Sequence, residues 1–557
     1  MKNIIYDNLE KMIEENVQEK MYIHIASTMA RPNALINTMI RMFEEKNPQF
    51  TFSVTAVHGN LHAIAISGIA KKVITGFLGD NYPKPRTNSL YANVLKYHIP
   101  FEIEMVSLLT FVLRLMGGAL NLPYMVTNSL GESDLENSSY TNTILVGENK
   151  DQKIRLIKSL FPDITVVHGV CADTNGNIIL SSPSGEGQWG CLAARKGVLA
   201  TVEKIVDANT FQMHSDKVII PGSRVLGVCE VPYGAYPQAV RTFGIEGIQN
   251  YYDDYDYFVE ARELVSDPLT AQKWYMDNIK KCFSHDYWKR ITKHNWKFIH
   301  EGKKQYEDIN IDSELTLNEI LIILAARTII RKVKKGNYKT ILAGIGMSHI
   351  ATWVAQRILN KEGIGIHIMA ELGFYGMTAV DGDVFLFSQK IADTTEQRCD
   401  ILQTLGTQVG FERTCLGVIG AAEIDCYGNI NSSQLFDGTY MTGSGGANDI
   451  ASVTDCIVVC VPGKKKLVNK VNFITSPGAN ICSIVTTFGE FEKEDGKFKL
   501  NSWYDAKKKY ITPQNALSEY SQWEQNQIKE ILKYEQEISE EERKVVWEID
   551  RKGVYRK

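Results

Sequence analysis

The chain has 557 residues, of which 44% are hydrophobic and 23% are charged, and its formal net charge is -4. A chain of this length does not fit around one ordinary hydrophobic core, so two or more domains are expected. The small net charge argues against a protein whose main function is nucleic-acid binding, but it is compatible with an acidic cofactor bound at one local basic site.

Cysteine usage and hydropathy indicate a soluble protein of a reducing compartment. The ten cysteines are scattered without a CxxC pair, which favours buried free thiols. Residues 1–20 lack the apolar region of a secretory signal. The longest apolar stretch, residues 105–126, contains Arg114 and two adjacent glycines, so we expect a buried helix and a turn there rather than a membrane span. We therefore expect a cytoplasmic protein without membrane contact.

Apolar runs of strand length alternate with segments of helical period in both halves of the chain. The predicted strand–helix–strand units are residues 22–26, 33–45 and 51–57, and residues 340–343, 349–361 and 365–370. This alternation is typical of βαβ units and a parallel sheet, so an α/β fold is predicted.

A short turn sequence occurs in both halves. DTNGNI at residues 173–178 recurs as DCYGNI at residues 425–430, each time after an apolar run. Asn and Gly supply the positive φ that tight turns need, so a hairpin-type turn explains each copy taken alone. The matching positions of the two copies favour a duplicated domain.

Two further segments are helical by composition. Residues 251–312 are dense in Tyr, Trp, Lys, His and Asp and read as helices plus a connection. After about residue 513, Glu and Lys recur at helical spacing, which predicts a solvated terminal helix.

The most informative segment is GIHIMAELG at residues 365–373, in which an apolar strand ends in Glu371 and Gly373 follows. Ligands of open α/β sheets bind beyond the carboxyl ends of strands, so Glu371 stands where active residues usually stand. A capping or ion-pairing role is the common alternative for a glutamate at a strand end.

Glycine-rich loops form a second group of candidates. TGSGGAND at residues 442–449 holds Gly443, Gly445 and Gly446, whose N–H groups are predicted to face one anion or oxyanion. It matches neither a Walker motif nor a first-turn GxGxxG, and a flexible turn is the alternative. GIGMSH at residues 344–349 is a predicted strand-to-helix turn with Ser348 as the N-cap.

Histidines near the first-half strands have no spacing that ties them to a metal. These residues are His24, His58, His62 and His168. We therefore predict no metal site.

Taken together, these segments resemble family I CoA-transferases, especially the glutaconate CoA-transferase type. In this chain the α-subunit-like and β-subunit-like parts would be fused in one polypeptide. Residues 340–346 and 371–373 resemble the opening of the β subunit. The other matching segments are residues 420–431, 442–449 and 471–478 in the second half, and residues 75–79, 130–134, 173–178, 201–206 and 231–237 in the first.

The resemblance implies two similar open α/β domains in tandem. It divides the chain into an α-subunit-like domain (residues 1–260), a helical linker (261–312), a β-subunit-like domain with the catalytic glutamate (313–512) and a charged helical tail (513–557). It also implies a homo-oligomer.

By resemblance, Glu371 is the nucleophile of a ping-pong reaction that moves CoA from an acyl-CoA donor to a carboxylic acid through a glutamyl-CoA thioester. Coenzyme A is then a substrate, and no cofactor is bound permanently. A free glutamate has a pKa of about 4.3, so it is expected to be ionised at neutral pH without a general base. Gly443, Gly445 and Gly446 would bind the oxyanion or CoA, and one active site per chain is expected. His58 is the expected first-half counterpart of Glu371.

One motif departs from the family. Its α-subunit glycine motif, GGFxxxGxP, is here HIASTMARP at residues 24–32, which keeps only the proline. Arg31 and Ser27 in this loop are candidates for the substrate pocket, although a surface or capping arginine is the alternative. Two other functions stay open: an acyl-CoA hydrolase, in which water intercepts the intermediate, and a CoA-ester-binding protein without turnover.

Overall fold

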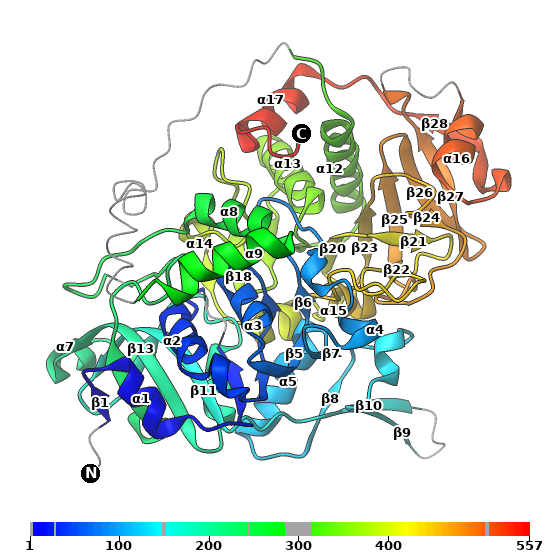
Figure 1. Cartoon of the computed structure of the whole chain (residues 1–557). Coiled ribbons are helices and arrows are strands. Elements are labelled where there is room, and N and C mark those ends of the chain that lie inside the picture. The colour runs from blue at the N-terminus through cyan, green and yellow to red at the C-terminus, as the bar shows by residue number, and fades with distance from the viewer. Residues whose placement is uncertain are drawn as a thin grey trace.

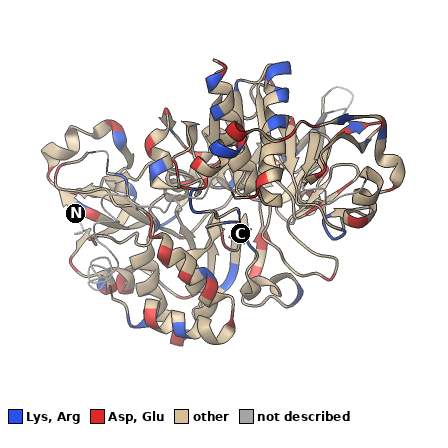
Figure 2. Cartoon of the chain, turned by 90° about the horizontal axis from the view of Figure 1, so that it is seen from above, with Lys and Arg blue, Asp and Glu red and all other residues tan. Residues whose placement is uncertain are grey.

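The computed structural model describes residues 4–26, 29–147, 152–242, 244–283, 313–506 and 512–556. Its two halves each contain one large sheet with helices packed against it (Figure 1). Basic and acidic residues are interspersed over the helices and loops, with neither sign confined to one half (Figure 2). No helix in the described part of the chain is long and apolar enough to cross a membrane.

The first sheet is parallel from edge to edge. Its strands in spatial order are β1 (Ile5–Tyr6), β15 (Val225–Glu230), β13 (Gly197–Val206), β11 (Ile164–Asp173), β2 (Tyr22–Ile25), β3 (Phe50–Ser53), β5 (Ala70–Thr75) and β7 (Glu102–Met105). Two antiparallel strands, β12 (Ile178–Leu180) and β14 (Val218–Ile220), extend from β11. Smaller sheets are β8 (Tyr124–Thr127), β10 (Gln152–Lys158) and β9 (Thr141–Val146), and the pair β4 (Ala56–Val57) and β6 (Phe77–Leu78).

Short amphipathic helices accompany this sheet. They are α1 (Leu9–Asn16), α2 (Asn33–Phe43), α3 (His62–Ser67), α4 (Val94–Tyr97), α5 (Leu108–Ala119), α6 (Gly187–Ala193) and α7 (Ala208–Gln212). Helix α5 is the buried helix predicted from the apolar stretch. Arg114 is tolerated inside it because Nη1 pairs with Glu104 Oε1 at 2.7 Å, which satisfies the buried charge.

The second sheet mixes parallel and antiparallel strands. Their order is β19 (Gln397–Arg398), β18 (Phe374–Met377), β17 (His367–Ala370), β16 (Thr340–Ala343), β20 (Cys415–Gly420), β23 (Cys456–Val459), β25 (Ile481–Thr486), β26 (Gly489–Glu494), β27 (Lys497–Trp503) and β28 (Ile528–Tyr534). A small sheet holds β22 (Ile430–Asn431), β21 (Glu423–Asp425) and β24 (Leu467–Val468). The helices of this half are α12 (Leu317–Lys335), α13 (Met347–Lys361), α14 (Gln389–Thr394), α15 (Ala447–Val453), α16 (Pro513–Tyr520) and α17 (Glu540–Ile549).

The predicted pair of similar α/β domains is confirmed by strand order. The parallel run β15-β13-β11-β2-β3 of the first half has the same order and chain sequence as β25-β23-β20-β16-β17 of the second. In both halves the first strand in chain order, β2 or β16, has the second strand on one side. The third, fourth and fifth strands follow on its other side. Such a switch point opens a crevice beyond the carboxyl ends of the strands.

The repeated turn has the same hydrogen bonds in both copies. One carboxylate oxygen of Asp173 accepts from the N–H groups two and four residues later, and Asp425 does the same. The Asn four positions after each Asp accepts a hydrogen bond from a distant glycine N–H, Gly222 in the first half and Gly478 in the second. The local turn chemistry alone does not require this long-range contact, so its repetition supports the duplication.

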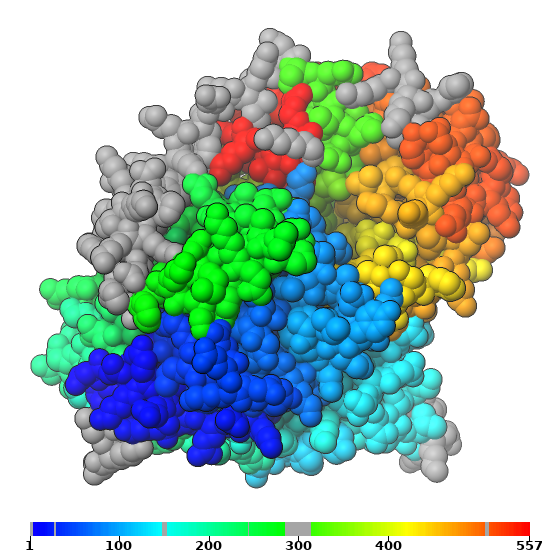
Figure 3. Space-filling model, in the orientation of Figure 1, coloured from blue at the N-terminus to red at the C-terminus, as the bar shows by residue number. Residues whose placement is uncertain are grey.

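The segment between the halves is helical where it is described. Helices α8 (Tyr255–Val265) and α9 (Pro268–Tyr275) lie over the first half, drawn green over blue in Figure 3. Residues 284–312 of the predicted linker lie outside the described residues.

The predicted C-terminal tail contains the helices α16 and α17, but it also contains a strand and packs on the second half, so the prediction of a solvated tail is wrong. Residues 513–556 include β28, which pairs in parallel with β27 and extends the second sheet. Helix α17 packs against α12 and α13 and buries Val545, Val546 and Trp547. Charged residues dominate the pattern of this segment, so the sequence reading did not recognise the short apolar face that drives the packing.

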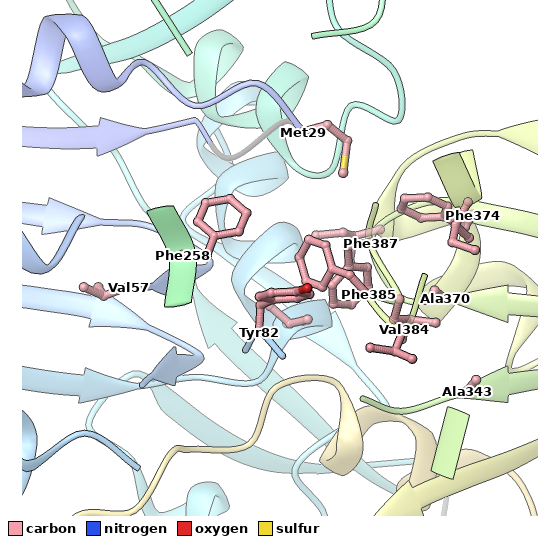
Figure 4. Close-up of a cluster of buried hydrophobic side chains, with 14 of the residues drawn as sticks. Met29, Val57, Tyr82, Phe258, Ala343, Ala370, Phe374, Val384, Phe385 and Phe387 are labelled. Atoms are coloured by element: carbon pink, nitrogen blue, oxygen red, sulfur yellow. The ribbon is translucent and has the colours of Figure 1, made fainter. Parts of the chain in front are cut away.

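An aromatic cluster joins the halves. Tyr82 stacks on Tyr255 with ring centroids 4.5 Å apart, and Phe258 and Phe385 meet these rings edge to face. Figure 4 shows Tyr82 and Phe258 with Phe385. Phe385 belongs to the second half, so burial of these rings stabilises the contact between the sheets.

Candidate active site

A cleft of about 420 Å³ lies between the two halves. The first half contributes Arg31, Thr55, His58 and Asn81, and the second contributes the segment around Glu371, the glycine loop 443–446 and the turn 344–348. The carboxyl ends of β3 and β17 both lead into this cleft, as the switch-point rule predicts.

Glu371 directly follows β17 and is partly buried in the wall of the cleft. Its Oε2 accepts a hydrogen bond from Gly446 N–H at 3.0 Å, and its carbonyl oxygen accepts one from Thr404 Oγ1 at 2.8 Å. Gly373 has φ +109°, and a Cβ there would overlap the carbonyl oxygen of Cys399. The backbone after the glutamate therefore requires glycine, which explains the motif read from the sequence.

The ionisation of Glu371 differs from the sequence expectation. Burial raises the pKa of its carboxyl to about 7, the Gly446 N–H opposes the rise, and the charge of Asp449 adds to it. At neutral pH the side chain therefore lies near its titration midpoint instead of being almost fully ionised. Perturbed carboxyl groups in clefts are typical of functional sites.

The glycine loop approaches Glu371 through one N–H group. Gly443 N–H donates to Ser432 O and Gly445 N–H donates to Gly76 O, both at 3.0 Å. The prediction that all three glycine N–H groups face one anion is therefore wrong. Gly443 and Gly445, with φ of +107° and +51°, shape the loop, and Gly446 is the donor at the carboxylate.

The first half holds this loop in place. Leu78 N–H donates to Thr442 O at 2.9 Å, and Leu108 N–H donates to Gly445 O at 3.1 Å. Asp449 accepts hydrogen bonds from Ser107 Oγ and Leu109 N–H at the start of α5, at 2.6 and 2.9 Å. A carboxylate at a helix N-terminus satisfies N–H groups that have no partner inside the helix.

The part of the cleft wall that the first half contributes carries Arg31, His58 and Asn81. Arg31 Nη2 lies 2.9 Å from His58 Nε2, and Asn81 Nδ2 lies 3.1 Å from the same atom. Burial, together with the charges of Arg31 and His62, lowers the pKa of His58 well below its ordinary value. His58 is thus a neutral acceptor between two donors.

His58 is not the structural counterpart of Glu371. β2 pairs with β3 through Tyr22 and Thr51, and β16 pairs with β17 through Thr340 and His367. Aligning these registers places Thr55 where Glu371 stands. The sequence reading placed the strand end at Val57, but β3 ends at Ser53.

Two other predictions change or fall outside the described residues. Ser348 lies within α13, where its Oγ donates to Gly344 O at 2.7 Å. The N-cap is Gly346, whose N–H donates to His349 Nδ1 at 3.0 Å. Ser27 lies outside the described residues, so its predicted place in the substrate pocket stays a prediction.

Sequence reasoning missed two hydroxyl groups in the cleft wall. Ser444 Oγ and Tyr555 Oη are buried without a hydrogen-bond partner among the described residues, and both side chains line the cleft. Ser444 lies inside the glycine loop and was detectable there. Tyr555 enters only through the packing of the C-terminal segment, which no local pattern signals. Within the described residues, no group of three or more His, Cys, Asp or Glu side chains is placed to hold a metal ion.

Comparisons with known proteins agree with this architecture. Residues 6–230 match the model of the family described as Coenzyme A transferase. One of the glutaconate CoA-transferase subunits from Acidaminococcus fermentans is 31% identical over 172 residues, which are 28% of this chain and 59% of that protein. The first half of the chain is thus similar to the coenzyme A transferase family.

The chain is also similar to both subunits of a second enzyme. The two 3-oxoadipate CoA-transferase subunits from Pseudomonas knackmussii are 31% identical over 152 residues and 27% identical over 175 residues, which are 27% and 30% of this chain. The chain spans 51% and 62% of the length of these two curated relatives. An acyl-CoA transferase apoenzyme from Escherichia coli O157:H7 covers 96% of both chains with a TM-score of 0.64 and 13% identity, which shows a shared fold.

Proposed function

We propose that this protein is a coenzyme A transferase that moves CoA from an acyl-CoA donor to a carboxylic acid, with Glu371 as the covalent nucleophile. The observation that carries the proposal is the Glu371 carboxylate in the inter-half cleft, bonded to Gly446 N–H at 3.0 Å. A carboxylate, a backbone donor and a cleft shared by two halves are the parts that such a transfer requires.

The reaction begins when the ionised carboxylate attacks the thioester carbonyl carbon of the donor. Gly446 N–H holds Oε2, which leaves Oε1 as the attacking atom. The C–S bond breaks, CoA leaves as a thiolate, and an acyl-glutamyl anhydride forms. The thiolate then attacks the glutamyl carbonyl carbon, the donor acid leaves as a carboxylate, and a glutamyl-CoA thioester remains. An acceptor carboxylate reverses both steps and leaves as its CoA ester.

Gly446 has a defined task in these steps. When Oε1 is acylated, Oε2 becomes the carbonyl oxygen of the glutamyl group. Attack at that carbonyl places negative charge on Oε2, beside the N–H that already donates to it. Loss of one such preorganised donor typically lowers the rate by ~10²–10³.

The raised pKa of Glu371 sets the pH range of the reaction. Only the carboxylate is nucleophilic, so its reactive fraction rises as pH increases through about 7. We expect the rate of the first half-reaction to follow that single ionisation. The anhydride and thioester are both sensitive to water, which is consistent with a glutamate that lies in a cleft between two halves.

Intact mass spectrometry tests the proposal. Wild type and Glu371→Gln are incubated with a panel of short acyl-CoA esters without an acceptor acid, and Glu362→Gln, at an exposed ion pair with Lys334, serves as the control. We expect a CoA adduct on wild type and control that hydroxylamine removes, and none on Glu371→Gln. An adduct that persists in Glu371→Gln, or CoA release that does not depend on the acceptor acid, would count against transfer through Glu371.

A further inference from the structure

A second cavity, of about 220 Å³, lies between the two halves, and its lining residues differ from those of the larger cleft. The first half lines it with side chains from residues 180–188 and 216–219, and the second half with side chains from residues 398–403. Ser184 N–H donates to Cys399 O at 3.3 Å at this place. The second cavity is therefore part of the contact between the halves.

Three polar side chains in the wall of the second cavity have no hydrogen-bond partner among the described residues. They are the hydroxyl groups of Ser182 and Ser184 and the amide of Gln403. Ser184 is only 9% exposed, but its Oγ keeps accessible surface. A buried hydroxyl group without a partner is unfavourable, so a polar ligand in the cavity would remove a penalty.

The carboxylate groups of this wall already have partners. Asp400 is 4% exposed and accepts hydrogen bonds from Gln188 Nε2, from Trp189 Nε1 at 3.3 Å and from the backbone N–H of residue 403 at 2.7 Å. Asp216 forms an ion pair with the neighbouring Lys217 at 3.2 Å. Neither carboxylate group compensates the remaining cation of the wall.

That cation is Arg398, the last residue of β19, whose side chain is exposed. Its Nη1 donates to the neutral carbonyl oxygen of Ala392 at 3.1 Å. No carboxylate group in the described part of the chain forms an ion pair with it. A guanidinium group carries five N–H donors in one plane, so Arg398 keeps donors for an anion in the cavity.

The segment that carries Arg398 also holds the backbone around Glu371. Cys399 N–H donates to Gly373 O at 2.8 Å, and Thr404 Oγ1 donates to Glu371 O at 2.8 Å. A ligand that contacts both Arg398 and the serines of the first half would bridge the two halves beside this segment. It would therefore restrain the backbone that positions the Glu371 carboxylate.

We propose that the second cavity binds a small anion with a phosphate group, through Arg398, Ser182 and Ser184, and that binding there activates the reaction at Glu371. Phosphate fits better than carboxylate because its three terminal oxygens match donors that come from both halves. The volume of about 220 Å³, against about 420 Å³ for the larger cleft, suits a phosphate ester of a few carbon atoms. The binding site is independent of the proposed function, whereas the activation rests on it.

Thermal denaturation tests the binding site. Wild type, Arg398→Gln and Ser184→Ala are titrated with glycerol 3-phosphate and, separately, with inorganic phosphate, and sodium chloride at equal ionic strength is the reference. We expect glycerol 3-phosphate to raise the Tm of wild type by roughly 1–3 °C more than that of either variant. If inorganic phosphate gives the same variant-dependent rise, the phosphate group alone is the ligand. If only the ester does, the ligand is a phosphate ester.

The control variant is Arg195→Gln, in which an arginine that is bonded to Asn121 and lines neither cavity is changed in the same way. It should keep the wild-type rise in Tm, and circular dichroism would check that each variant is folded. Phosphate also stabilises proteins by exclusion from their surface, which affects all variants alike. An equal rise in wild type, Arg398→Gln and Ser184→Ala would therefore overturn the site.

Single-turnover mass spectrometry tests the activation and separates it from the proposed function. Glycerol 3-phosphate should raise the rate of glutamyl-CoA formation in wild type by at least about twofold, because a restrained carboxylate is better oriented for attack. The rate of Arg398→Gln should not respond. A Tm rise that depends on Arg398 without any change in rate would refute the activation and leave the binding site standing. If no CoA adduct forms under any condition, the proposed function and the activation both fail, and the Tm measurement decides the binding site.

Discussion

At the scale of single residues, Glu371 is subject to two conflicting requirements. It must ionise to act as a nucleophile, yet it lies where burial raises its pKa to about 7. A carboxyl group whose pKa is higher in the folded protein than in the unfolded chain destabilises the fold when pH rises, because the folded state binds more protons. The site thus trades stability for reactivity, as functional sites commonly do.

This conflict predicts a pH-dependent stabilisation by Glu371→Gln. The neutral amide avoids the ionisation penalty, which is small near the unfolded pKa of about 4.3 and is complete above about pH 7. We expect the gain in unfolding free energy over wild type to be larger at pH 8 than at pH 5, by on the order of 2 kcal/mol. Thermal denaturation at both pH values measures it. A Tm difference that is the same at pH 5 and pH 8 would contradict the raised pKa, and Glu362→Gln should show no such trend.

At the scale of elements, the glycine loop 442–446 is positioned by the other half of the chain. Its backbone bonds to the segment 76–78 and to the start of α5, and Asp449 fixes that helix start. The loop is therefore rigid although it is rich in glycine. Its pattern predicted a binding loop, but only pairing with the first half determines which N–H group reaches Glu371.

Gly446→Ala tests this arrangement. The φ of Gly446 is -89°, which alanine adopts without strain, but an added Cβ would overlap Glu371 Oε2. The carboxylate must then move away from its donor, so we expect glutamyl-CoA formation to slow by ~10²–10³ while the protein stays folded. Single-turnover mass spectrometry measures this rate.

The matched control for the loop is Gly463→Ala. No atom lies within 4 Å of the Cβ position at Gly463. This variant should react at the wild-type rate. If Gly446→Ala reacts as fast as the control, the contact between the loop and Glu371 has no role in the reaction.

At the scale of the whole molecule, the candidate active site exists only when the two halves are packed together. The aromatic cluster around Tyr82 and Phe385 lies at this contact, and Tyr255 Oη donates to Asp383 across it at 2.9 Å. The predicted homo-oligomer and cytoplasmic location stay predictions.

Phe385→Ala should weaken the contact between the halves. Phe385 is 7% exposed, and removal of a buried phenylalanine ring typically costs about 3–5 kcal/mol. We expect a lower denaturation midpoint and reduced CoA transfer at temperatures where the wild type is stable. Phe436→Ala, at a side chain that is 93% exposed, should change stability by no more than about 0.5 kcal/mol. Equal midpoints for the two variants would show that the cluster contributes nothing to stability.

The sequence by itself determined the elements that local physics controls. Apolar runs and helical periods located β16, α13 and β17, and the repeated Asp-x-x-Gly-Asn turn indicated two similar halves. The position of Glu371 at a strand end was also readable, because strand alternation and the following glycine are local signals.

Only the tertiary structure decided how distant groups combine. It showed that burial raises the pKa of Glu371, that Thr55 rather than His58 is its counterpart, and that Gly446 alone among the loop glycines donates to it. It also placed Arg31 in the cleft wall beside His58, and folded the charged C-terminal segment onto the second sheet. These properties depend on burial and on contacts between residues far apart in the chain, and neither is encoded in any short stretch of sequence.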